Sequence, residues 1–84
     1  MRTFSIRIRE AIGHKDIEGR IKKGSSFENR IIREASKHFH CLTYVTCKSD
    51  SYSEDGTQQF SGLVATTKGM VLGSYSAILN REGK

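Results

Sequence analysis

The start of the chain alternates between polar and apolar residues. In "RTFSIRIRE" (residues 2–10), Phe4, Ile6 and Ile8 fall on one face of an extended chain, and polar residues fall on the other. A period of two residues is typical of a strand that buries one face. We therefore predict a strand over residues 2–10 whose apolar face packs on the core.

The next segment is rich in glycine and has few apolar residues. "AIGHKDIEGRIKKG" (residues 11–24) contains three glycines, with Ile12, Ile17 and Ile21 as its anchors. This composition allows either a loop or a short second strand near residues 16–22. We favour the strand.

Residues 25–39, "SSFENRIIREASKHF", have the periodicity of a helix. An apolar residue recurs at every fourth position, which places one apolar stripe along a helix. Ser25 followed by Glu28 has the spacing of a capping box, in which each side chain binds an otherwise unpaired backbone amide. The predicted buried stripe is Phe27, Ile31, Ala35 and Phe39.

Three further strands are expected after the helix. The first leads into a polar loop, "DSYSEDGT", in which Asp55-Gly56 is a strong turn signal. Lys68-Gly69 then gives a two-residue connection, consistent with a tight hairpin between the last two strands. The expected strands are residues 41–49, 58–67 and 70–79.

These elements predict one small α+β domain over residues 1–84. The expected architecture is an antiparallel sheet of four or five strands with one helix packed on one face, in the order β-(β)-α-β-β-β. Residues 80–84 are expected to form a frayed tail. A chain of 84 residues buries only about 60–65% of its unfolded surface, so the core is thin.

The charge balance favours anionic partners. Fourteen Lys and Arg residues against nine Asp and Glu residues give a net charge of +5, and the pI is near 9.5. Such a protein suits nucleic acid, an acidic protein surface or a nucleoprotein assembly. No apolar run approaches the roughly 20 residues of a membrane span, and the N-terminal stretch lacks the apolar run of a signal peptide. We expect a cytoplasmic protein with no membrane partner.

The stretch "HFHCLTYVTC" (residues 38–47) raises the question of a metal site. If residues 41–49 form one extended strand, Cys41 and Cys47 lie roughly 20 Å apart and cannot share a zinc ion or a disulfide. His38, His40 and Cys41 would lack a fourth ligand. We expect no metal and no cofactor, with Cys41, Val45 and Cys47 facing the core around Thr43.

Catalysis by this chain is a weaker alternative. A Cys–His pair would need a third group to orient the histidine, and nothing in the sequence specifies one. A small ribonuclease toxin needs only a few acid–base groups near a phosphodiester. His14, His38, His40, Arg30 and Arg33 can supply such groups. Since histidines on a basic surface are usually solvated, we expect no catalytic residues.

Basic side chains gather on the segments expected to be exposed. Leu42, Tyr44 and Lys48 should face outward beside the arginines of the first strand, and an open sheet face with Arg, Lys and Tyr suits phosphate contacts and base stacking. The same face would equally suit a protein partner, and a second layer or a dimer mate would instead cover it. The oligomeric state stays open. The candidate binding residues are Arg7, Arg9, Arg20, Lys22, Lys23, Arg30, Arg33 and Tyr44.

One long run of the sequence also has a recognisable arrangement. "EGRIKKGSSFENRIIREASKHFHCLTYV" (residues 18–45) combines Glu18-Gly19, a polar stretch, a Ser-led helix ending in "ASK", and a strand containing Val45. This arrangement resembles the middle of a small phage anti-CRISPR family that inhibits the type I-F surveillance complex. The order of strands and helix is similar too. The resemblance implies a non-enzymatic inhibitor that binds the complex where target DNA must hybridise to its crRNA.

We therefore expect a binding protein and not an enzyme. The preferred role is a phage-type inhibitor that docks on a CRISPR nucleoprotein complex through a basic surface and blocks target DNA binding. The alternatives are a general DNA- or RNA-binding regulator and, after that, a small ribonuclease toxin. Fold alone gives little help in choosing among them.

Overall fold

The alternating segment at the start of the chain forms strand β1 (Arg2–Glu10), as predicted. Phe4, Ile6 and Ile8 are all buried. The computed structural model describes residues 2–22, 24–46 and 49–81. Its further elements are β2 (Gly13–Ile21), α1 (Phe27–Phe39), β3 (Thr43–Val45), β4 (Ser49–Tyr52), β5 (Gln58–Thr66) and β6 (Val71–Leu79).

Strand β2 confirms the strand reading of residues 11–24. It pairs antiparallel with β1 along its full length, from Arg2 opposite Ile21 to Glu10 opposite Gly13. The strand begins three residues earlier than predicted, because the hairpin turns at Ala11-Ile12. Ile12 is therefore not an anchor: it sits at the tip of the hairpin and is 92% exposed.

Helix α1 confirms the predicted stripe but corrects its cap. Phe27, Ile31 and Ala35 are buried, and Phe39 packs against the core while partly exposed. The N-cap residue is Ser26 and not Ser25. The Ser26 hydroxyl accepts a hydrogen bond from the backbone amide of Asn29 at 3.2 Å, which satisfies one of the unpaired amides of the first turn.

The strand predicted at residues 41–49 is broken into β3 and β4. Both strands pair with β5. Val45 lies opposite Val64 and Ser49 lies opposite Ser61, so an advance of four residues from β3 to β4 corresponds to only three residues along β5. The pairing register with β5 is therefore shifted by one residue between β3 and β4. Strand β4 also takes up the first part of the expected polar loop.

The outcome for the inward face of this segment is mixed. Thr43 is buried and Val45 packs against the core, as expected, while Leu42 and Tyr44 are exposed. Cys41 is exposed and precedes β3, so its predicted core position is wrong. Cys47 and Lys48 lie outside the described residues.

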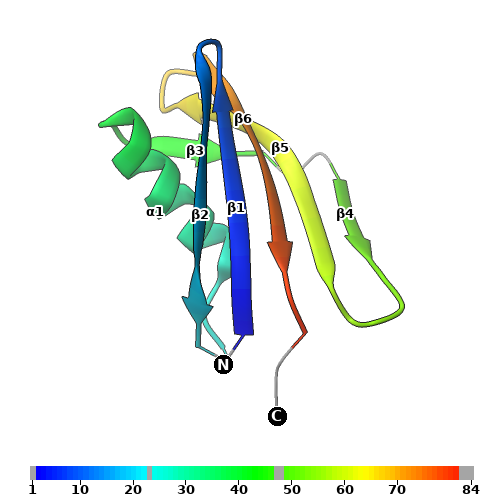
Figure 1. Cartoon of the computed structure of the whole chain (residues 1–84). Coiled ribbons are helices and arrows are strands. Elements are labelled where there is room, and N and C mark those ends of the chain that lie inside the picture. The colour runs from blue at the N-terminus through cyan, green and yellow to red at the C-terminus, as the bar shows by residue number, and fades with distance from the viewer. Residues whose placement is uncertain (1, 23, 47–48, 82–84) are drawn as a thin grey trace.

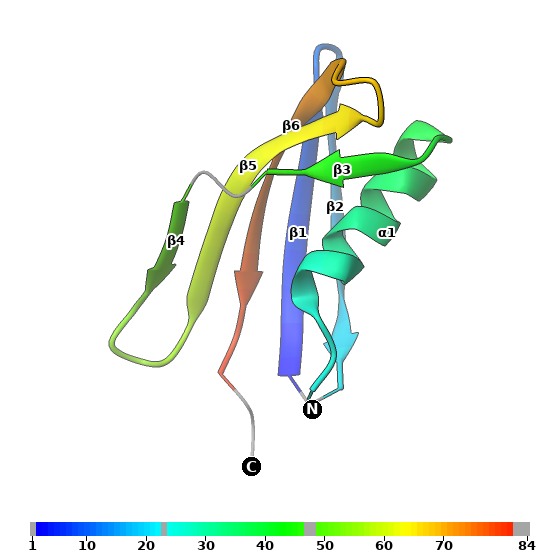
Figure 2. The same ribbon diagram turned by 180° about the vertical axis from the view of Figure 1, so that it is seen from behind.

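The sheet confirms the α+β class with one helix on one face. Its order is β2-β1-β6-β5, with β3 and β4 both on the outer edge of β5, and every pairing is antiparallel. Within the described residues it holds six strands, because the third predicted strand is divided in two. Figures 1 and 2 show α1 on the β1–β2 side of the molecule and β4 at the opposite side, away from the helix.

The turns follow the predicted signals. Gly56, with φ of +88°, ends the turn between β4 and β5, where the Asp55 carboxylate accepts hydrogen bonds from the Ser53 hydroxyl and the Thr57 amide. Gly69, with φ of +89°, lies in the β5–β6 connection, but that connection spans residues 67–70 and is four residues long instead of the predicted two. Asn80, expected in a frayed tail, instead donates from its backbone and side-chain nitrogens to Thr3.

The core lies between α1 and the strands beneath it. The Phe27 ring packs 5.5 Å from the Phe4 ring and 5.5 Å from the Phe60 ring, measured between centroids. These contacts fix the start of the helix over the sheet. The buried cluster is Phe4, Ile6, Ile8, Ile21, Phe27, Ile31, Ala35, Val64, Tyr75, Ala77 and Leu79.

Candidate anion-binding site

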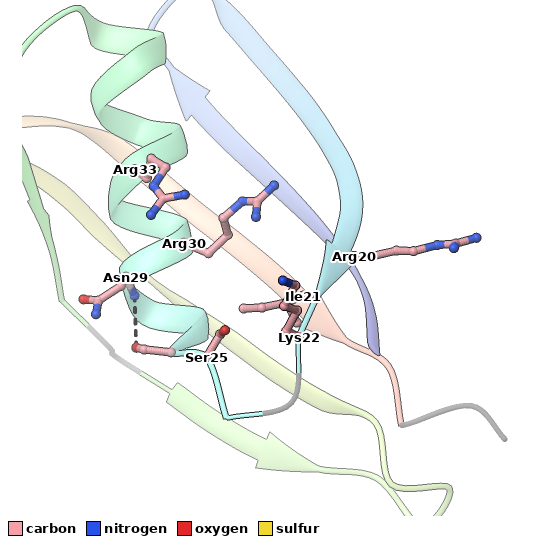
Figure 3. Close-up of a pocket in the computed structure, with 8 residues that line it drawn as sticks. Arg20, Ile21, Lys22, Ser25, Asn29, Arg30 and Arg33 are labelled. Carbon is pink, nitrogen blue, oxygen red and sulfur yellow. Dashed lines mark hydrogen bonds between the residues drawn. The ribbon is translucent and has the colours of Figure 1, made fainter. Parts of the chain in front are cut away.

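A basic pocket lies where the end of β2 meets the start of α1 (Figure 3). Its volume is about 430 Å³. Four of its residues are cationic and most of the others are polar, so the pocket suits an anion more than an apolar ligand. The lining residues are Arg20, Ile21, Lys22, Ser25, Ser26, Asn29, Arg30 and Arg33; we call this set the basic pocket.

The local fold brings these residues together. Ile21 is buried at the end of β2, which leaves its neighbours Arg20 and Lys22 exposed on either side of it. The chain then turns back, with the Ser25 amide donating to the Lys22 carbonyl at 3.1 Å. Phe27 packs on the core and so fixes the orientation of α1. As a result, Arg30 and Arg33 on the following turns point toward β2.

Arg30 and Arg33 project from the helix toward β2 (Figure 3). The guanidinium of Arg30 lies 5.1 Å from the centre of the Phe4 ring, and its Nε donates to Glu34 Oε1 at 3.3 Å. Arg30 is therefore held in place and partly neutralised. Arg33 is exposed and forms no ion pair within the described part of the chain, so its charge is available to a ligand.

The other two cations lie at the rim. Lys22 is exposed just after the end of β2, and Arg20 extends from β2 away from the helix (Figure 3). Arg20 thus widens the positive surface beyond the pocket. The helix N-terminus adds a favourable partial charge for an anion, although the Ser26 hydroxyl is already engaged by the Asn29 amide.

Arg7, Arg9 and Tyr44 lie elsewhere, on the sheet face that points away from α1. Their strand neighbours are buried on the helix side, so these alternate positions face outward. Among the described elements, no helix or strand covers this face. The structure therefore gathers Arg20, Lys22, Arg30 and Arg33 but not these three, and Lys23 lies outside the described residues.

Arg7 is already paired. Its Nε and a terminal nitrogen contact the two carboxylate oxygens of Asp16 at 2.7 Å and 3.1 Å, because Asp16 lies directly opposite Arg7 in the β1–β2 ladder. The hydrogen bond and the charge of Asp16 raise the pKa of Arg7. The hydrogen bond from Arg7 lowers the pKa of Asp16. This mutual neutralisation reduces what Arg7 offers to a phosphate.

Sequence reasoning missed the polar half of the basic pocket. The capping-box spacing explains Ser25 without a ligand, and no motif points to Asn29, although Asn29 lies in the first turn of the helix. Hydroxyl and amide groups at a helix start beside arginines are a recognisable pattern for anions. The placement of Arg30 and Arg33 beside Lys22 depends on the turn at residues 22–26, which no motif in the sequence defines.

The histidines do not converge on one point. His14 lies on β2, 4.0 Å from Asp16, while His38 Nε2 lies 3.3 Å from Glu10 Oε1, and His40 caps the end of α1. None of them lines the basic pocket. Among the described residues, no three His, Cys, Asp or Glu side chains gather closely enough to hold a metal ion. The single-strand distance argument for Cys41 does not hold, since Cys41 precedes β3.

Comparison with known proteins identifies no relative of this chain. No protein-family model matches the chain, and neither a curated protein nor a solved structure matches it significantly. Within the described ranges, no helix is long and apolar enough to cross a membrane.

Proposed function

We propose that this protein is a non-enzymatic binding protein that docks on a nucleic-acid-containing partner through the basic pocket. The observation that carries the proposal is the pair Arg30 and Arg33, which project from one helix into a pocket that Lys22 also lines. Guanidinium groups present planar sets of donors that match phosphate oxygens.

The open shape of the site supports a polymer over a small anion. Arg20 carries positive charge outward from the pocket, and the whole chain has a net charge of +5. A polyanion can engage all of these charges at once and release counterions from each phosphate that is neutralised. A single small anion would use only the centre of the site.

The particular role follows the resemblance to the anti-CRISPR family. In that role the protein acts in the host cytoplasm, and the basic pocket contacts the phosphates of a CRISPR surveillance complex along the surface that target DNA must occupy. Inhibition then needs no chemistry, because occupancy alone excludes the DNA. A general DNA- or RNA-binding regulator would use the same pocket on free nucleic acid.

The ribonuclease alternative has less support. General acid–base catalysis needs its groups within hydrogen-bond reach of one phosphodiester. His14 lies on β2, whereas His38 and His40 lie at the C-terminal end of α1, and all three are outside the basic pocket. A phosphate held by Arg33 and Lys22 would have no histidine from the pocket lining beside it.

The proposal is tested by charge reversal inside and outside the pocket. In the double variant Lys22→Glu/Arg33→Glu, binding of a short labelled single-stranded RNA should weaken about tenfold or more. The slope of log K against log salt should fall by roughly 1.4, for two lost phosphate contacts on a single strand. Both residues are exposed, so the fold should persist.

The matched control is Lys15→Glu/Lys68→Glu. It changes the net charge by the same amount at two exposed residues outside the pocket. Equal weakening by both double variants would show that overall charge, and not the pocket, drives binding. If wild type fails to bind free RNA but competes with target DNA for a purified type I-F surveillance complex, the inhibitor role is favoured over the general regulator.

A further inference from the structure

A second concavity lies on the helix side of the sheet, between α1 and β4. Its volume is about 270 Å³, and its character is opposite to that of the basic pocket. Residues of β2 line the basic pocket, whereas Asp50 of β4 lines this groove. Strands β2 and β4 lie on opposite sides of the molecule (Figure 2). Its lining residues are Phe27, Glu28, Ile31, Asp50, Phe60 and Tyr75; we call this set the acidic groove.

The floor of the acidic groove is apolar. Phe27 and Phe60 meet edge to face with their ring centroids 5.5 Å apart, and Ile31 lies beside them. The Tyr75 hydroxyl donates to the Thr46 carbonyl at 3.1 Å, so the polar end of this side chain is satisfied. The floor therefore offers ring and aliphatic surface to a ligand.

Two carboxylates stand at the rim. Asp50 is the ladder partner of Phe60 and so projects on the same face of the sheet, and Glu28 extends from the first turn of α1. Both side chains are exposed, and neither forms an ion pair within the described ranges. Tyr52 lies two residues beyond Asp50 on the same face and is 71% exposed.

We propose that the acidic groove binds an arginine side chain from an extended segment of a partner protein. The aliphatic stem of arginine would cover the apolar floor, while its guanidinium would face Glu28 and Asp50. A purely apolar side chain would leave both carboxylates without a partner, and an acidic one would be repelled. The volume is below the usual range for small-molecule sites and suits one long side chain.

The neighbouring sheet edge suits an extended segment. Strand β4 pairs with β5 on one side, and in the described part of the chain no strand pairs with its other side. A peptide can add to such an edge through backbone hydrogen bonds, which directs alternate side chains to the helix face. Tyr52 would then offer its ring to the same guanidinium. This site and the basic pocket would let one chain contact protein and nucleic acid at once.

The proposal is tested by titrating the full-length ¹⁵N-labelled protein with the peptide acetyl-Val-Arg-Val-amide, followed by NMR. The backbone amides of Glu28, Asp50 and Phe60 should shift in a saturable way. The same peptide with citrulline in place of arginine keeps the shape and loses the charge. It should bind about tenfold to twentyfold more weakly, because it loses the charge pairs with both Glu28 and Asp50.

Variants locate the site. Asp50→Asn should weaken the arginine peptide about threefold to fivefold, whereas Glu54→Gln, at an exposed carboxylate in the β4–β5 turn, should have no effect. Lys22→Glu/Arg33→Glu should retain peptide binding, which separates this site from the proposed function. Equal binding of the citrulline peptide, shifts confined to other surfaces, or no shift at millimolar peptide would each overturn the proposal.

Discussion

The carbonyl oxygen of Thr46 lies directly over Gly62. A Cβ atom added to Gly62 would lie 1.5 Å from that oxygen. Thr46 is held there by three hydrogen bonds: its amide donates to the Leu63 carbonyl at 2.9 Å, its hydroxyl accepts from the Leu63 amide at 3.1 Å, and its carbonyl accepts from the Tyr75 hydroxyl at 3.1 Å. The bare backbone of Gly62 thus allows the edge of the sheet to pass from β3 toward β4.

Gly62→Ala should destabilise the protein by about 3 kcal/mol or more, since backbone must move to admit the new methyl group. Chemical denaturation would measure the loss. The control is Gly13→Ala, because a Cβ at Gly13 meets no atom within 4 Å and its φ is not positive. Similar losses in the two variants would contradict the close approach of Thr46.

Ile31→Ala should cost roughly 2–5 kcal/mol, because Ile31 is 2% exposed and lies in the middle of the helical stripe. Ile12→Ala removes the same atoms at the exposed hairpin tip and should change the free energy of unfolding by less than about 0.5 kcal/mol. Denaturant titration of both variants checks the assignment of the buried face. A small loss for Ile31 would mean that the helix is rotated from the orientation described.

Ser26→Ala should cost about 1 kcal/mol, since it removes the hydroxyl that accepts from the Asn29 amide. Ser25→Ala should cost much less, because Ser25 contributes its backbone amide and not its side chain to the turn. Thermal unfolding of the two variants distinguishes the adjacent capping positions. A larger loss of stability in Ser25→Ala than in Ser26→Ala would indicate that Ser25 is the N-cap residue.

Asp55 should make stability depend on pH in the acid range. Hydrogen bonds from the Ser53 hydroxyl and the Thr57 amide lower the pKa of Asp55 from 3.8 to about 2. The unfolded chain therefore takes up the proton first as the pH falls, so the stabilisation is complete above about pH 4 and is lost by about pH 2. Asp55→Asn should lower the melting temperature near neutral pH and approach wild type at about pH 2. A difference that stays constant across this range would contradict the assignment.

The sequence predicted those elements whose pattern is local. Phe4, Ile6 and Ile8 define β1 by alternation, and Phe27 and Ile31 define the helix by their fourfold spacing. The break between β3 and β4 was missed because it depends on Gly62, which is distant in sequence and looks like any other strand glycine. Cys41 was misplaced for a different reason: after the helix cap at His40 the strand begins only at Thr43, so Cys41 lies in the connection and not on the strand.

The sequence predicted which basic residues are exposed but not that four of them line one pocket. Arg20, Lys22, Arg30 and Arg33 were all expected to be exposed and basic, but their convergence requires the turn that joins β2 to α1. The pairing of Arg7 with Asp16 required the register of the first hairpin, whose turn at Ala11-Ile12 carries no strong signal. Electrostatic partners across a ladder follow from register, and register follows from the turn.

The place of β6 in the sheet has a consequence for how the chain folds. Strand β6 lies between β1 and β5, so a strand that follows the other five described strands in the sequence joins the two halves of the sheet. During synthesis the β1–β2 hairpin and the helix can form early. Their apolar faces stay partly exposed to solvent until β6 has been synthesised and pairs with β1. Closing a contact between such distant segments is slow compared with forming a hairpin. Until β6 has paired with β1, the apolar faces of the first hairpin and the helix are therefore open to aggregation.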